Sequence, residues 1–176
     1  MCGICGIVNF KSSEPVDRDI LLNMTQVMEH RGPDDQGIYI DKGVGLGSRR
    51  LSIIDLAGGR PPIANEDESM WIVFNGEIYN YRELRGYLRK RGHAFRTRTD
   101  TEVILHAYEQ YGDACVEHFN GQWAFAIWDR RRQRLFLSRD RLGIRPLFHT
   151  MGANKFLFAS EIKALLVDPD VPREID

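Results

Sequence analysis

The stretch MCGICGIVNF, residues 1–10, places one cysteine directly behind the first methionine and a second cysteine three residues further on. From Gly3 onward the stretch is short, apolar and β-branched, which predicts a buried strand at the start of the chain. Two functions compete for Cys2. It could belong to a CxxC motif that serves redox chemistry or binds zinc, or it could be a nucleophile held rigidly at the end of the chain.

The composition predicts a single globular domain: the chain has 176 residues and 43% of them are hydrophobic. Lys and Arg number 24 against 25 Asp and Glu, a balance that gives no general attraction to phosphate backbones or anionic lipid. We therefore expect no nucleic-acid partner. The first residues lack the pattern of a secretory signal, and no apolar run approaches the roughly 20 residues that cross a bilayer. We expect a cytoplasmic protein without a membrane partner, in which the three cysteines are reduced thiols.

Predicted strands and helices follow the first stretch. Apolar residues recur at helical spacing from residue 20 to 28, and further helices are predicted over 80–92, 99–112 and 160–168. Asn80 and Thr99 stand as N-caps, each with a glutamate at capping-box spacing. Segments 30–37 and 55–69 are rich in Gly, Pro and acidic residues and predict loops. Strands are predicted over 37–40, 43–53, 70–79, 93–97, 122–129, 134–140, 146–150 and 155–160.

Many strands with short turns and a few separated helices indicate an α+β protein whose antiparallel sheets are covered by helices. The pattern alone does not fix the number of layers.

The redox hypothesis for Cys2 fits poorly, because a reactive CxxC motif sits at the N-terminus of a helix, and this one precedes a strand. A zinc site would need Cys115 and His118 to join Cys2 and Cys5 as ligands. Cys5 and Cys115 are better explained as small buried hydrophobic residues.

The nucleophile hypothesis explains more. A small residue at position 2 allows Met1 to be removed, after which Cys2 carries both a thiol and a free α-amine. The unperturbed pKa of an α-amine is about 7.7 to 8.0, which suits a general base at neutral pH. One residue can then supply both the nucleophile and its base.

Seven motifs in order carry a family resemblance: MCGICGIVN, HRGPDDQG, RRLSIID, VFNGEIYNYRELR, RTDTEVILHAYEQYG, FNGQWAFAIWD and RDRLGIRPL. Together they resemble the glutamine amidotransferase domain of asparagine synthetase, a class II amidotransferase of the N-terminal nucleophile hydrolase superfamily. The resemblance covers nearly the whole chain. It implies a four-layer αββα sandwich of two antiparallel sheets.

The resemblance also implies a reaction: Cys2 attacks the side-chain carboxamide of glutamine, and water releases glutamate from the resulting thioester, leaving ammonia. Asn75, through its side-chain amide, and Gly76, through its backbone N–H, would hold the oxyanion. By dipeptide alone, Asn75-Gly76 would be a hairpin turn. The residues implied to bind glutamine are Arg50 for the α-carboxylate, Asp100 for the α-ammonium with Glu77 beside it, Leu51 and Ile53 along the pocket, and Asn75 and Gly76. Asp100 would also read as a helix-capping acid.

Position 48 departs from the family pattern, because many relatives have His where this chain has Ser48. Trp123 reads as a core residue. Arg31 and Arg49 read as solvated surface cations or structural ion pairs.

The family resemblance implies a domain over 1–168 and the start of a linker over 169–176, leading to an ATP-pyrophosphatase synthetase domain that this sequence does not contain. This domain is expected to need no cofactor or metal, whereas ATP and magnesium would serve the synthetase domain. A homodimer is possible. Two alternatives stay open: an acceptor other than aspartate, and a catalytically idle module that binds zinc through the four ligands named above.

Overall fold

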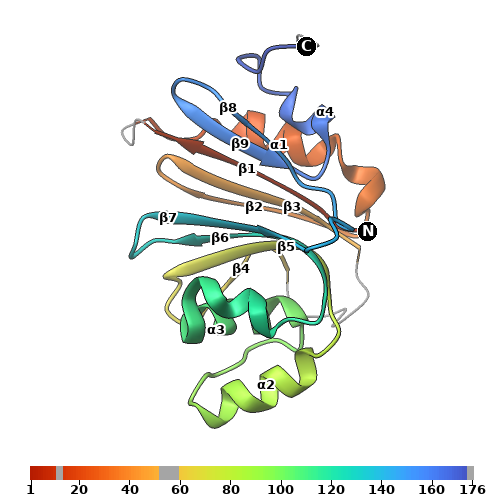
Figure 1. Ribbon diagram of the computed structural model, residues 1–176. Coiled ribbons are helices and arrows are strands. Elements are labelled where there is room, and N and C mark those ends of the chain that lie inside the picture. Colours follow the sequence, from red (N-terminus) through yellow and green to blue (C-terminus); the bar gives the residue numbers. More distant parts are fainter. Residues whose placement is uncertain (11–13, 52–59, 174–176) are drawn as a thin grey trace.

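Two antiparallel sheets lie face to face at the centre of the computed structural model, which describes residues 1–10, 14–51 and 60–173 (Figure 1). The first sheet has the strand order β2-β3-β1-β9-β8 and the second the order β4-β5-β6-β7. The strands are β1 (Gly3–Asn9), β2 (Asp35–Asp41), β3 (Val44–Arg50), β4 (Ile63–Ala64), β5 (Met70–Ile78), β6 (Gly121–Asp129), β7 (Arg134–Arg139), β8 (Phe148–Met151) and β9 (Lys155–Ala159).

Helices cover the outer face of each sheet, with α1 and α4 on the first sheet and α3 on the second, where α2 packs against α3 (Figure 1). The helices are α1 (Arg18–Gln26), α2 (Tyr81–Lys90), α3 (Asp100–Tyr111) and α4 (Ile162–Leu165), with two 3₁₀ helices, η1 (Glu29–Arg31) and η2 (Gly112–His118). This arrangement confirms the α+β class and the four-layer αββα sandwich that the family resemblance implied.

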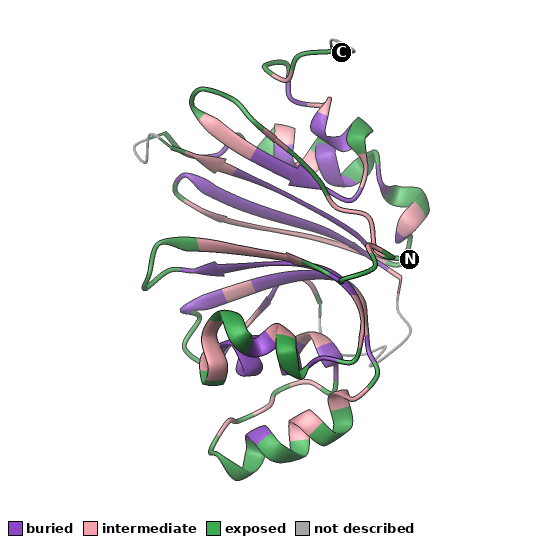
Figure 2. Ribbon diagram, in the orientation of Figure 1, coloured by how far each residue is buried: buried purple, intermediate pink, exposed green. Residues whose placement is uncertain are grey.

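The strands carry buried residues on both faces because each sheet packs against helices on one side and the other sheet on the opposite side (Figure 2). In β1, Ile4 packs between the two sheets, whereas Cys5 and Ile7 pack beneath α1 and α4. Successive side chains of a strand point to opposite faces, so this alternation sets which residues can reach the space between the sheets.

Three expectations about secondary structure are wrong. The strand expected over 93–97 is absent, because the backbone N–H groups of Arg96 and Thr97 donate to the carboxylate of Glu102 instead of to a neighbouring strand. The loop expected over 55–69 contains the short strand β4, in which Ile63 is buried and pairs with Ile72. The helix expected over 160–168 is limited to α4.

The two predicted N-caps differ. Thr99 caps α3, since its hydroxyl accepts a hydrogen bond from the N–H of Glu102 at 3.3 Å. Asn80 stands at the start of α2 but makes no capping hydrogen bond with its side chain. That side chain instead donates to the His118 carbonyl and accepts from the Asn120 N–H, so it ties the start of α2 to the segment before β6.

Among the described residues, no helix combines the length and the apolar character needed to cross a membrane.

Candidate active site

Strand pairing carries Cys2 to the space between the sheets. The Gly3 position of β1 pairs with Arg49 of β3 and Ile4 pairs with Ser48, so Cys2 comes beside the end of β3, at Arg50. Because side chains alternate along a strand, Cys2 points to the same face as Ile4, toward the second sheet. The nucleophile candidate therefore lies at one open end of the sandwich and not on its outer surface.

Asn75 reaches the same space from the second sheet. It lies within β5, not in a turn, and pairs with Ala124 of β6. Val73, two residues earlier, packs between the sheets, and the same alternation turns Asn75 to that face. The hairpin interpretation of Asn75-Gly76 is thus wrong, because the second sheet continues through both residues to Ile78.

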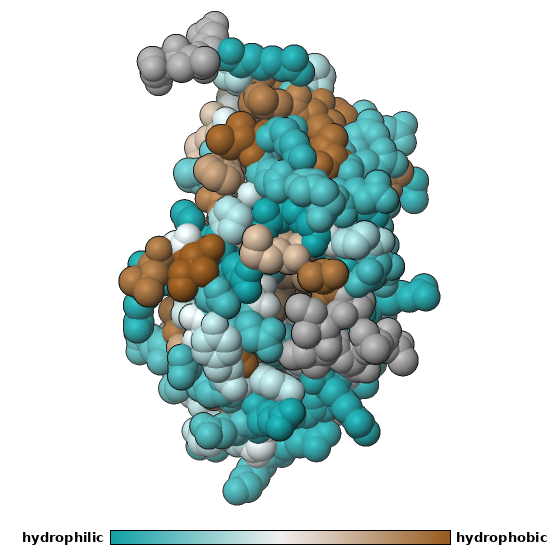
Figure 3. Space-filling view, turned by 90° about the vertical axis from the view of Figure 1, so that its right-hand side faces the viewer, coloured by the Kyte–Doolittle hydropathy of each residue, from teal (hydrophilic) through white to brown (hydrophobic). Residues whose placement is uncertain are grey.

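A pocket lies where these strand ends meet. Figure 3 views the molecule from the side on which the N-terminus lies, and shows a mostly hydrophilic face with apolar side chains in separate groups. Six of the predicted site residues line the pocket together with Cys2, and only Ile53 falls outside the described residues. The predicted lining residues are Arg50, Leu51, Asn75, Gly76, Glu77 and Asp100.

The Cys2 sulfur lies against the backbone of Leu51. The Leu51 N–H donates to Cys2 Sγ at 3.4 Å, and Sγ lies 3.8 Å from the Leu51 carbonyl oxygen. Leu51 therefore lies directly at the Cys2 thiol, on the wall of the pocket.

The Asn75 side chain is 1% exposed, and its Nδ2 is buried without a hydrogen-bond partner among the described residues. Buried amide groups in native proteins are almost always paired, so an unpaired donor on a pocket wall calls for a ligand. The neighbouring Gly76 accepts no side chain, because a Cβ there would lie 2.2 Å from the Gln122 carbonyl oxygen. Both observations fit an oxyanion site.

Charged residues of both signs line the pocket. Arg50, at the end of β3, is 9% exposed, and Asp100, the first residue of α3, is 5% exposed. The Ile78 N–H donates to Asp100 Oδ2 at 3.0 Å and joins the helix start to the end of β5. Burial raises the pKa of the Asp100 carboxyl to about 6; the Ile78 N–H opposes this rise and the nearby Glu77 charge adds to it. The pocket thus offers a cationic and an anionic group to a zwitterionic ligand.

Arg31 contacts the backbone of Cys2, the candidate nucleophile, which the sequence did not predict. The structural ion pair is confirmed, since Nη1 of Arg31 lies 3.0 Å from Glu161 Oε1. In addition, Arg31 Nε donates to the Cys2 carbonyl oxygen at 3.0 Å. Burial alone would raise the pKa of Glu161, but hydrogen bonds from Arg31, His30 and Lys163 lower it to about 2. Arg31 therefore holds the backbone of Cys2 in place. A single sequence does not reveal this role, because it depends on a contact between residues far apart in the chain.

Arg145 is a pocket residue to which the sequence analysis gave no role. It lines the pocket together with Met1, and its Nη1 donates to the Met1 sulfur at 2.6 Å. Its backbone is held by Asp140, which accepts from the Arg145 N–H, and by Arg139, which donates to the Arg145 carbonyl. The RDRLGIRPL motif, which contains Arg145, was the sequence signal for this region. Only the folded structure shows that Arg145 lies beside the N-terminus.

The structure does not gather the four ligands of the zinc alternative. Cys5 lies in the core beneath α1 and α4, whereas Cys115 lies in the core beneath α3, on the other side of the sandwich. The interpretation of both as buried hydrophobic residues is confirmed, since each is 0% exposed. Trp123 is a core residue as predicted, and Ser48 lines the pocket.

A family model described as "Glutamine amidotransferase domain" matches residues 1–176. Asparagine synthetase [glutamine-hydrolyzing] 3 of Bacillus subtilis is 44% identical over 178 residues, which cover 100% of this chain and 29% of that protein. Asparagine synthetase [glutamine-hydrolyzing] 2 of the same organism is 45% identical, over 100% of this chain and 24% of that protein. A putative asparagine synthetase [glutamine-hydrolyzing] 2 of Methanocaldococcus jannaschii is 40% identical, over 99% and 36%. The chain therefore spans about a quarter to a third of the length of these relatives.

Two solved structures have the same fold. Glutamine phosphoribosylpyrophosphate amidotransferase of B. subtilis, complexed with ADP and GMP, superimposes with a TM-score of 0.77 at 21% identity, over 94% of this chain and 43% of that one. A structure described as the allosteric regulatory enzyme of purine biosynthesis gives a TM-score of 0.75, also at 21% identity and over the same shares of the two chains. At this identity the likeness concerns the fold alone, and it agrees with the N-terminal nucleophile hydrolase fold expected from the sequence.

Proposed function

We propose that this chain, which belongs to the glutamine amidotransferase domain family, hydrolyses L-glutamine to glutamate and ammonia with Cys2 as the nucleophile. The observation that carries the proposal is the unpaired amide of Asn75, buried on the wall of the pocket that also holds Cys2. An oxyanion is the ligand that such a donor suits best. Removal of Met1 frees the α-amine of Cys2, which then acts as the general base.

The reaction proceeds in two stages. In the first, the α-amine accepts the thiol proton, Cys2 Sγ bonds to the carboxamide carbon, and the tetrahedral intermediate places its oxyanion against Asn75 Nδ2 and the Gly76 N–H. The intermediate collapses to a thioester as ammonia leaves with a proton returned by the amine. In the second stage, water attacks the thioester carbon, the same oxyanion site is used again, and glutamate leaves as the Cys2 thiol is restored.

The charged residues of the pocket orient the substrate. Arg50 offers a planar guanidinium to the α-carboxylate, the geometry that favours arginine over lysine. Asp100 offers a carboxylate to the α-ammonium, with Glu77 close by. The raised pKa of Asp100 supports this assignment, because a buried carboxylate that is costly to ionise gains most from a bound cation.

We further propose that the ammonia supplies an ATP-pyrophosphatase synthetase domain that converts aspartate to asparagine. The names of the relatives and the small share of their length that this chain spans support that partner. ATP and magnesium would act in the synthetase domain, and the proposed hydrolysis of glutamine at Cys2 uses neither. The acceptor is tested in a protein that contains both this domain and the synthetase domain. Formation of asparagine from glutamine, ATP and aspartate would identify aspartate as the acceptor.

The decisive experiment measures glutamate release from glutamine by the purified chain after mass spectrometry has shown that Met1 is gone. Cys2→Ser is compared with Cys115→Ser, which changes a buried thiol far from the pocket. We expect activity to be lost in Cys2→Ser and kept in Cys115→Ser. Equal activity in both variants, or no glutamate release by processed wild-type protein, would contradict the proposal.

A further inference from the structure

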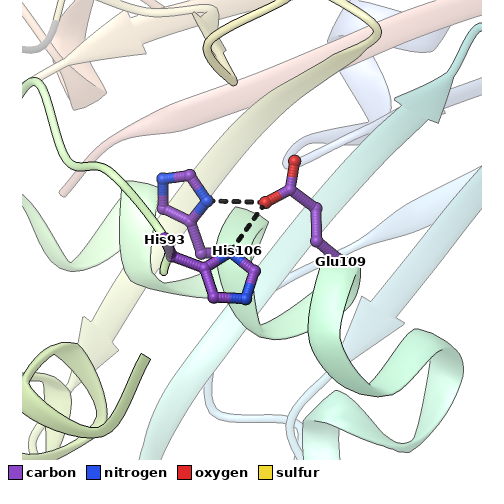
Figure 4. Close-up of side chains that lie close together, drawn as sticks. All are labelled: His93, His106 and Glu109. Atoms are coloured by element: carbon purple, nitrogen blue, oxygen red, sulfur yellow. Dashed lines mark hydrogen bonds and ion pairs between the residues drawn. The ribbon is translucent and has the colours of Figure 1, made fainter. Parts of the chain in front are cut away.

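A second group of chemically active side chains lies on the outer side of the second sheet, away from the pocket. His106 and Glu109 come from α3, and His93 comes from the loop that follows α2 (Figure 4). Glu109 Oε2 lies 2.6 Å from His106 Nδ1 and 3.2 Å from His93 Nδ1. Both imidazole rings thus turn the same nitrogen toward one carboxylate oxygen.

Each ring also faces an oxygen at its other nitrogen. His93 Nε2 lies 3.2 Å from Gln110 Oε1, and His106 Nε2 lies 3.7 Å from Glu102 Oε1. A neutral imidazole carries only one N–H, so a neutral ring cannot satisfy oxygens on both sides. The cluster therefore calls for positive charge between its members.

A metal ion meets this demand better than two added protons. The two ring centroids are 5.2 Å apart, a separation at which two imidazolium ions repel each other. We propose that His93 Nδ1, His106 Nδ1 and Glu109 Oε2 bind Zn²⁺, with water in the fourth position. Two histidines and one carboxylate form a known zinc donor set, and tetrahedral coordination separates ligand atoms by about 3.3 Å. The three donor atoms already lie within 4.8 Å of one another.

The surroundings of the three donors resemble the outer shell of a metal site. Histidine ligands usually donate their second N–H to an oxygen, which fixes the ring orientation. Here Gln110 Oε1 lies 3.2 Å from His93 Nε2, whereas His106 Nε2 is buried without a hydrogen-bond partner among the described residues and lies 3.7 Å from Glu102 Oε1. The third donor is oriented in the same way, since Asn65 Nδ2 donates to Glu109 Oε1 at 2.7 Å and leaves Oε2 to face the histidines.

Solvent and ions can reach the cluster. His93 and Glu109 line one wall of a surface hollow, with side-chain exposures of 16% and 18%, whereas His106 is fully buried behind them. The hollow gives the fourth ligand position access to water. Its other lining residues are Asn65, Glu66, Asp67, Ser69, Met70, Asp129, Arg131 and Arg132.

Zinc bound here would act as a brace. It would join the loop after α2 to the middle of α3, the helix whose first residue, Asp100, lines the glutamine pocket. The inference does not depend on the proposed glutaminase reaction, because its ligands and its measurements are separate from that reaction.

The test uses Zn²⁺ itself, in protein carrying Cys2→Ser so that the pocket thiol cannot bind metal. Calorimetric titration at neutral pH is expected to give one Zn²⁺ per chain and a rise in the thermal unfolding midpoint. His93→Ala and Glu109→Gln should each weaken binding at least about tenfold, the smallest loss typical of disturbing a metal site. His149→Ala, an exposed histidine on β8, is the matched control and should bind like the parent.

Circular dichroism of the metal-free variants shows whether each one folds. X-ray absorption of the parent Zn²⁺ complex gives an independent result that needs no ligand variant, and we expect two imidazoles with oxygen neighbours. No stoichiometric binding at micromolar Zn²⁺ would overturn the proposal, since the cluster would then hold only protons. Sulfur at the metal, or equal binding by His93→Ala, Glu109→Gln and His149→Ala, would overturn it as well.

Discussion

Replacing Asn75 by alanine separates activity from stability more sharply than other changes in the pocket. Asn75 Nδ2 is buried and has no hydrogen-bond partner among the described residues, so it stabilises little in the resting protein. If it holds the oxyanion, its loss should lower kcat by about 10² to 10³, or about 2.7 to 4 kcal/mol, with little change in KM.

The same substitution should hardly change the free energy of unfolding. A buried donor without a partner costs about 1 to 3 kcal/mol, and its removal offsets the packing lost on truncation to alanine. We therefore expect the variant to unfold within about 1 kcal/mol of wild type. The assays are steady-state glutamate release over a range of glutamine concentrations and urea denaturation of the same preparation.

Asn80→Ala is the matched control. Its side chain makes two hydrogen bonds, at 2.9 Å to the His118 carbonyl and 3.0 Å from the Asn120 N–H. Its truncation should cost about 1 to 3 kcal/mol of stability and leave kcat unchanged. The reasoning is refuted if Asn75→Ala keeps kcat within tenfold of wild type, or if it loses activity only in proportion to a loss of folded protein.

Three further predictions concern other parts of the site. The pKa of Asp100 is raised to about 6, so its carboxyl is protonated below that pH and KM for glutamine should rise as pH falls through 6. Asp100→Asn should raise KM and flatten this pH profile, which is measured by glutamate release. Arg31→Ala removes the donor to the Cys2 carbonyl and the arginine that pairs with Glu161, so single-turnover glutamate release should slow by at least about tenfold. Arg31→Lys should recover part of the ion pair but not the Nε contact. Gly76→Ala places a Cβ 2.2 Å from the Gln122 carbonyl oxygen, so the strand must shift; thermal unfolding should show a loss of about 1 to 3 kcal/mol and kcat should fall as the oxyanion site is displaced.

Each of these predictions has an outcome that contradicts it. A KM for glutamine that is flat from pH 7 to about pH 5 in wild type would remove Asp100 from ammonium binding. Full activity in Arg31→Ala would mean that the Cys2 backbone is held well enough by its strand. Wild-type stability in Gly76→Ala would show that β5 and β6 separate at this point without cost.

Local sequence determined much of the fold. The apolar, β-branched character of residues 3–9 predicted β1, and the apolar periodicity with Thr99 as N-cap predicted α3, because these signals act between neighbours in the chain. Family motifs supplied the layer count and the site residues, which composition and periodicity alone left open. The pocket then brought together Cys2, Asn75 and Asp100, from segments far apart in the sequence.

Tertiary structure decided what depends on partners distant in sequence. The strand expected over 93–97 does not form because Glu102, on the following helix, takes its N–H groups. Arg31 was expected to be a surface cation or part of a structural ion pair, and only folding showed that it also contacts the Cys2 carbonyl. The sequence alone thus predicted most of the elements and the candidate nucleophile. Only the folded sandwich decided which buried donors stay unpaired and which charges meet, since those depend on packing between layers.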